Sequence, residues 1–93
     1  MPVRVIASIT AAKGKGAELA RAMGANLRNV QKEPGCEQYT LFIGLEDPDK
    51  LVMLERWKDR ASLDVHLALA RSRPQTAPTL RAGPSTIEFF DIA

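Results

Sequence analysis

Four segments of the chain show the pattern of β-strands. They are residues 3–10, 37–45, 51–58 and 85–92. In the first, VRVIASIT, every second residue is apolar, which is typical of a strand with one buried face. The second and third are rich in β-forming residues, and only the short polar turn EDPDK separates them. This short link predicts an antiparallel hairpin.

Two further segments have apolar residues every three or four positions, the spacing of an amphipathic helix. They are residues 17–32 and 60–71. Pro34 and Gly35 end the first, because proline cannot continue a helix and glycine permits the turn. Asp59 is a favourable N-cap for the second. Residues 72–84 contain three prolines and a glycine, which predicts a loop with at most one short helical turn.

The order β-α-β-β-α-β predicts a ferredoxin-like α+β fold over residues 1–93, as one domain. Two helices would cover one face of a four-stranded antiparallel sheet. Two predicted strands are apolar on both faces. In the second strand, one face carries Tyr39, Leu41, Ile43 and Leu45, and the other carries Cys36, Thr40 and Phe42. In the third strand, one face carries Met53 and Trp57, and the other carries Val52 and Leu54. A solvated face would alternate with polar residues, so we expect a second copy to cover the open face, as a homodimer.

Composition narrows the functional classes. A net charge of +2 without a run of Lys or Arg argues against nucleic-acid binding. The single Cys36 has no partner for an internal disulfide, which favours a reducing compartment. No apolar run reaches the roughly 20 residues that span a bilayer, and the N-terminus lacks the pattern of a signal peptide. We therefore predict a cytoplasmic protein without a membrane partner.

The stretches EPGCEQYTLF and LVMLERWKDRASLDVHLA resemble the antibiotic biosynthesis monooxygenase family, and the resemblance extends over essentially the whole chain. It implies a dimeric α+β barrel in which each subunit holds a pocket between sheet and helices. It also implies oxidation of quinols or phenolic polyketides with O₂, using neither metal nor flavin. Other members resemble haem-degrading enzymes, enzymes that process sugar signals, or proteins with no known reaction.

The motifs predict neither a cofactor nor a metal. No G-x-G-x-x-G follows the first strand, and one His with one Cys is too few for a closed zinc site without carboxylates. The haem-degrading branch relies on an Asn in the first strand and a Trp in the second helix. Here Val5 and Ile6 occupy that part of the strand, and the only asparagines lie in the first helix. These differences argue against haem degradation.

His66 is the candidate catalytic residue. At about 100° per residue, it shares a stripe of the second helix with Leu63 and Leu67 and so faces the sheet or its edge. Imidazole titrates near neutral pH and suits the removal of a proton from a phenol or quinol. A core histidine bonded to a backbone carbonyl would show the same pattern, so both interpretations stand.

Three residues are candidates for substrate binding: Trp57, Tyr39 and Arg56. The indole would stack on an aromatic substrate and the phenol hydroxyl would orient a quinol oxygen, although both side chains are also common packing residues. Arg56 and its neighbour Glu55 point to opposite faces. One of them is expected to form an ion pair, with Arg4 or Glu88 as possible partners.

Two functions of different classes remain open. The first is a small cofactor-independent monooxygenase acting on a quinol or a phenolic, polyketide-like aromatic. The second is a dimeric domain that binds a small molecule without catalysis. The second is favoured by the sequence LARSRP, because many family members carry a second His at this place. Isomerase or cyclase activity on a small carbonyl compound is a further alternative. RNA binding is disfavoured, since the third strand lacks paired exposed aromatics.

Overall fold

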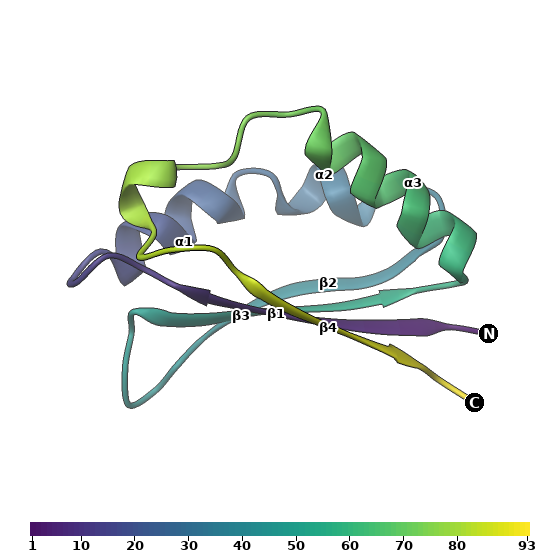
Figure 1. Ribbon diagram of the computed structural model, residues 1–93, viewed down its shortest axis with the longest axis horizontal. Helices are drawn as coiled ribbons and strands as arrows, with labels where there is room; N and C mark the ends of the chain where they lie inside the picture. Colours follow the sequence, from purple (N-terminus) through teal and green to yellow (C-terminus); the bar gives the residue numbers. More distant parts are fainter.

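A computed structural model describes all residues, 1–93. The elements are β1 (Val3–Thr10), α1 (Gly16–Gly24), α2 (Leu27–Gln31), β2 (Cys36–Ile43), β3 (Lys50–Trp57), α3 (Arg60–Arg71), a 3₁₀ turn η1 (Pro78–Leu80) and β4 (Thr86–Asp91). The strands form one antiparallel sheet in the order β2-β3-β1-β4. The helices lie together on one face of the sheet (Figure 1). The predicted ferredoxin-like α+β fold is confirmed.

The first helix differs from its prediction. The segment 17–32 forms two helices, α1 and α2, because the regular hydrogen-bond pattern is interrupted at Ala25 and Asn26. Both residues keep right-handed backbone angles, but the Asn26 amide bonds to the Met23 carbonyl, which tightens the turn. Gly24 and Asn26 both have low helix propensity, so the backbone can bend there at little cost. The remaining elements agree with the predicted ranges to within two residues, and α3 has the predicted bounds. Asp59 caps α3 as expected, accepting a hydrogen bond from the Ser62 amide at 2.8 Å.

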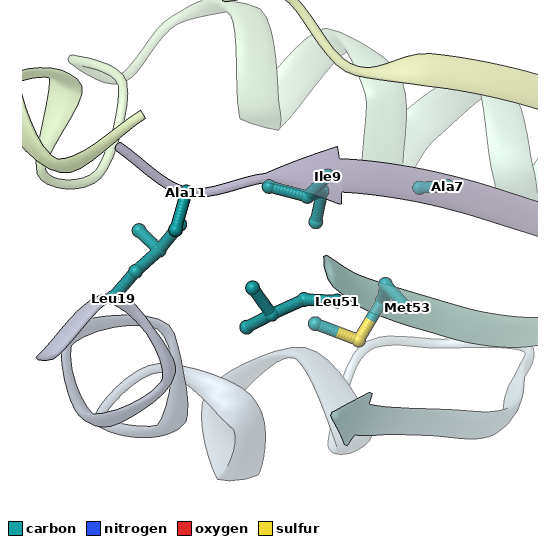
Figure 2. Packing of buried hydrophobic residues seen from close by; sticks show 6 residues of the cluster. All are labelled: Ala7, Ile9, Ala11, Leu19, Leu51 and Met53. Carbon is teal, nitrogen blue, oxygen red and sulfur yellow. The ribbon is translucent and has the colours of Figure 1, made fainter. Parts of the chain in front are cut away.

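The covered face of the sheet forms the core. Odd-numbered residues of β1 and β3 point to the helices and are buried, as the period-two pattern predicts. One cluster lies under α1, and Figure 2 shows its members: Ala7, Ile9, Ala11, Leu19, Leu51 and Met53. A second cluster lies towards α2 and α3: Val3, Val5, Val30, Trp57 and Leu63. The second cluster supports the candidate site.

Cys36 lies on the face opposite to the one predicted. The pairing of β2 with β3 shifts between Cys36 and Gln38, so that Cys36 is opposite Trp57. Such an irregularity adds a residue to one strand and reverses the facing of everything before it. Cys36 therefore packs against the second core cluster and not beside Phe42 and Thr40.

The other face of the sheet has no chain over it (Figure 1). Pairing places five apolar residues on this open face: Ile6, Phe42, Val52, Leu54 and Phe90. Phe42 and Phe90 are about half exposed. The open face thus carries the expected apolar side chains, together with polar ones such as Arg4, Arg56 and Glu88.

Gly35 makes the tight turn between α2 and β2. Its φ of +81° lies in the left-handed region that favours glycine. A Cβ here would collide with the side chain of Ser62 at the start of α3. The Gly35 carbonyl also accepts a hydrogen bond from the Lys58 amide at 2.8 Å. The turn thereby packs the chain at Gly35 against the beginning of α3, two residues after Glu33.

Gly35→Ala is expected to destabilise the protein by about 1–3 kcal/mol, because it combines a strained φ with a steric clash. Chemical denaturation of purified protein measures this change. Gly24→Ala is the matched control: no atom lies within 4 Å of the added Cβ, and its φ is not positive. An equal loss of stability in both variants would contradict this account of the turn.

Candidate functional site

His66 lies on the inner side of α3 and is only 8% exposed. Its neighbour on the same stripe, Leu63, is fully buried in the second core cluster. The helical pattern therefore placed the imidazole correctly. It is not, however, bonded to a backbone carbonyl, because its hydrogen-bond partner is a side chain.

That partner is Glu33, in the turn that follows α2. Nδ1 of His66 lies 3.0 Å from Oε1 of Glu33, and both side chains are largely buried. A carboxylate only accepts hydrogen bonds, so this contact assigns the proton of the neutral ring to Nδ1. Nε2 has no hydrogen-bond partner, and no fully buried polar side-chain atom is left unsatisfied. Nε2 is therefore accessible and is the basic nitrogen.

Trp57 forms the floor beneath the imidazole. The two rings are stacked, with centroids 4.6 Å apart and an angle of 28° between the planes. The indole is completely buried, and its N–H donates to Oε1 of Glu55 at 2.9 Å. The ring of Tyr39 meets the imidazole edge-on, with centroids 5.7 Å apart. Two rings, Trp57 and Tyr39, and the Glu33 carboxylate thus fix the orientation of His66, and Glu55 holds the indole in place.

Burial dominates the electrostatics of this cluster. It raises the pKa of the Glu55 carboxyl, against the opposing effects of the Trp57 hydrogen bond and of His66. Burial also raises the pKa of the Tyr39 hydroxyl above its ordinary value of 10, and the charges of Glu55 and Glu33 add to the rise. The Tyr39 hydroxyl is therefore protonated at neutral pH and is available as a hydrogen-bond donor.

A cavity of about 210 Å³ opens beside His66. It is lined by Asn26, Val30, Tyr39, His66, Ala70, Arg73, Pro74, Gln75 and Thr76. The lining comes from the break between α1 and α2, from β2, from α3 and from the segment after α3. The site therefore joins a basic nitrogen, a protonated phenol and a guanidinium around a space for a small molecule.

The four predicted site residues have different positions. His66 and Tyr39 line the cavity. Trp57 does not, because it is buried behind His66 and has no surface to offer a substrate. Arg56 lies on the open face of the sheet, where its Nε donates to Glu37 at 2.9 Å.

The ion pair expected for Arg56 or Glu55 does form, between Arg56 and Glu37 on the neighbouring strand, but its partner is not one of the two suggested. Arg4 donates to the side chain of Gln38 at 2.6 Å and to the backbone carbonyl of Glu55. The Glu55 carboxyl binds Trp57, as described above. Glu88 is exposed and forms none of the structure's hydrogen bonds or ion pairs, so neither candidate partner was correct.

Several site residues were not predicted. Glu33 is one of them: it precedes His66 by 33 residues, so only the fold shows that its carboxylate meets the imidazole. Asn26, Arg73, Gln75 and Thr76 reach the cavity from chain breaks and loops, whose positions no periodicity reveals. No group of three or more His, Cys, Asp or Glu side chains is placed to hold a metal ion. No helix is long and apolar enough to cross a membrane.

Comparisons with known proteins converge on one family. Residues 2–73 match the profile of the family described as antibiotic biosynthesis monooxygenase. The crystal structure of PA3566 from Pseudomonas aeruginosa is 32% identical, with a TM-score of 0.81, and the match covers 99% of this chain and 95% of that one. A crystal structure of an antibiotic biosynthesis monooxygenase is 25% identical, with a TM-score of 0.79 and 98% of both chains covered.

A further relative is the uncharacterized protein sll1783 of Synechocystis, which is 26% identical over 94 residues. That match covers 99% of this chain but only 64% of the relative. The chain is therefore similar to part of a longer protein as well as to single-domain structures.

Replacing Glu55 should change how stability depends on pH. Because the pKa of this carboxyl is raised in the fold, the unfolded chain loses its proton first. Folding stability of the wild type therefore falls as pH rises from the ordinary value of 4.5 towards the folded pKa. Glu55→Gln lacks this loss, so its free energy of unfolding relative to wild type should increase with pH.

Denaturant titrations between pH 4 and pH 8 measure the difference between the two proteins. Glu88→Gln, which removes an exposed carboxyl from β4, is the reference for the loss of one acidic group. A difference between Glu55→Gln and wild type that stays constant over this range would show that burial does not act on Glu55 as described.

Proposed function

Because this chain belongs to the antibiotic biosynthesis monooxygenase family, we propose that it oxidises a small quinol or phenol with O₂, without a cofactor. The observation that carries the proposal is the accessible Nε2 of His66, backed by Glu33 and facing the cavity. A neutral imidazole in this arrangement is suited to remove a hydroxyl proton. Glu33 would stabilise the imidazolium that results.

The proposed chemistry takes its electrons from the substrate. Deprotonation of the hydroxyl at Nε2 gives an electron-rich anion, which O₂ can oxidise. For a phenolic ring that carries a reactive CH₂, one oxygen atom enters as a carbonyl and the other leaves as water with the two hydrogens. For a simple hydroquinone, two electrons and two protons pass to O₂ and give a quinone and hydrogen peroxide. In both cases the protein supplies the base, the orientation and a cavity of restricted access.

Tyr39 supports this role. Its hydroxyl is kept protonated by burial and by the nearby carboxylates, so it would donate a hydrogen bond to the oxygen that develops charge. Trp57 acts differently from the prediction, because it supports His66 from behind instead of touching the substrate.

His66→Gln tests the reaction. With a panel of small hydroquinones and hydroxyaryl compounds, we expect oxygen consumption to fall about a hundredfold or more, since a positioned base contributes at least that much. An oxygen electrode measures the rate, and denaturation checks that the variant is folded. Arg71→Gln is the control, because Arg71 is an exposed residue of α3 that does not line the cavity. Undiminished turnover in His66→Gln would remove the histidine from the mechanism.

A binding domain without catalysis is the second candidate. The same cavity of about 210 Å³ has room for a small ligand without a reaction, and the stretch LARSRP after His66, which lacks a second His, favours this function. Trp57 is the chain's only tryptophan and stacks on His66, so its fluorescence should report ligand binding. Ligand-dependent fluorescence with no oxygen consumed over the whole panel would favour this second function.

The open face supports a proposed homodimer, in which two sheets pack against each other. Its apolar residues have no cover within one chain, and a second copy presents the same self-complementary surface. We expect sedimentation at micromolar concentration to give twice the chain mass of 10.2 kDa. A stable monomer would contradict the proposal.

Leu54→Arg should dissociate the dimer, because it places a charge in the middle of the open face. Val65→Arg is the matched control, since Val65 is an exposed apolar residue of α3 on the other side of the molecule. Equal effects of the two substitutions on sedimentation would show that the open face is not the interface.

A further inference from the structure

The inner end of the cavity disfavours a negative charge. Tyr39 and His66 form this end, with Glu33 bonded to the imidazole and Glu55 behind the indole. Burial and these two carboxylates both act against ionisation of the Tyr39 hydroxyl. A ligand group that arrives already charged would meet the same opposition. This end therefore suits a neutral hydroxyl that loses its proton only to His66.

The outer end has the opposite character. Arg73, just beyond the end of α3, lines the cavity, and its guanidinium forms no hydrogen bond or ion pair in the structure. The remaining polar lining there is neutral: Asn26, Gln75 and Thr76. No Asp or Glu lines the cavity. The outer end thus offers an unpaired cation with no competing carboxylate.

The segment that carries this cation is held in place. Nε of Arg81 donates to the backbone carbonyl of Thr76 at 2.9 Å, and the 3₁₀ turn η1 follows directly. Arg81 also pairs through its backbone with Ala11 at the end of β1. Arg81 therefore ties the segment that lines the outer end of the cavity to the sheet, and its guanidinium is a second positive charge on that segment.

The size of the cavity limits the ligand. A cavity of about 150 Å³ accommodates benzene, so about 210 Å³ accommodates one aromatic ring with one or two small substituents. Fused three-ring compounds would need a larger space. The ligand is therefore a single-ring compound.

We propose that the site selects a single-ring hydroxyaryl acid, with the hydroxyl at His66 and the carboxylate at Arg73. The proposal rests on the proposed function, because it uses the same cavity and the same basic nitrogen. Arginine suits the task, since its planar guanidinium matches a carboxylate with two parallel hydrogen bonds. Arg73 is then a specificity residue, and His66 remains the base.

Two probes of nearly equal shape test this inference: 4-hydroxyphenylacetate and its uncharged amide, 4-hydroxyphenylacetamide. Binding is measured without turnover, under nitrogen, by the fluorescence of Trp57. We expect the acid to bind about fivefold more tightly than the amide at low salt, as for a solvent-accessible ion pair. The preference should weaken with added salt, because exposed charge pairs are screened.

Arg73→Gln should abolish the preference for the acid and leave the affinity for the amide unchanged. Arg71→Gln is the matched control: it removes the same charge two residues away, from an arginine that does not line the cavity. This variant should retain the preference. No preference in the wild type, an equal preference in Arg73→Gln, or no binding of either probe would overturn the proposal.

The inference and the proposed function can fail separately. Preferential binding of the acid with no oxygen consumed in air would support the anion site and contradict the monooxygenase. Oxidation of an uncharged hydroquinone with no preference for the acid would contradict the anion site and support the proposed oxidation by O₂.

Discussion

The buried indole of Trp57 is the constraint on which the site depends. A fully buried indole needs a partner for its N–H, and Glu55, two residues earlier on the same face of β3, is that partner. A carboxyl buried beside apolar residues is costly unless it is hydrogen-bonded. The two side chains therefore satisfy each other, and neither is easily replaced alone. Their pairing fixes the surface on which His66 stacks.

The other side of His66 is fixed by a different route. Glu33 lies two residues before Gly35, whose left-handed conformation brings the chain against the start of α3. The imidazole is thus held between a carboxylate from the helix side and an indole from the sheet. Because Nδ1 is bonded to Glu33, Nε2 is the ring nitrogen that remains free and accessible. An inward-facing histidine without these two contacts would be only a packing residue.

The elements with regular periodicity could be predicted from the sequence, and the rest of the site could not. Alternation in β1 identified its buried residues, and the helical spacing around Leu63 placed His66 on the inner face. In β3, which is apolar on both faces, the sequence did not show which face is buried. The bulge that turns Cys36 inward depends on the pairing of β2 with β3, which no local pattern shows. Arg73 and Asn26 come from loops and helix ends. Their approach to His66 is set by tertiary packing of segments far apart in the chain.

Strand β3 also explains why the two candidate arginines differ. Its odd-numbered residues, among them Glu55 and Trp57, face the helices and build the site. Its even-numbered residues, among them Leu54 and Arg56, face the open side of the sheet. Period two makes these sets inseparable, since a shift of one residue would exchange them completely. Arg56 is therefore excluded from the site although its neighbours in sequence, Glu55 and Trp57, build it. Arg73 is remote in sequence from β3 and lines the cavity. Whether a strand residue belongs to a site therefore depends on the face of the sheet to which its side chain points, and not on its distance from the site along the sequence.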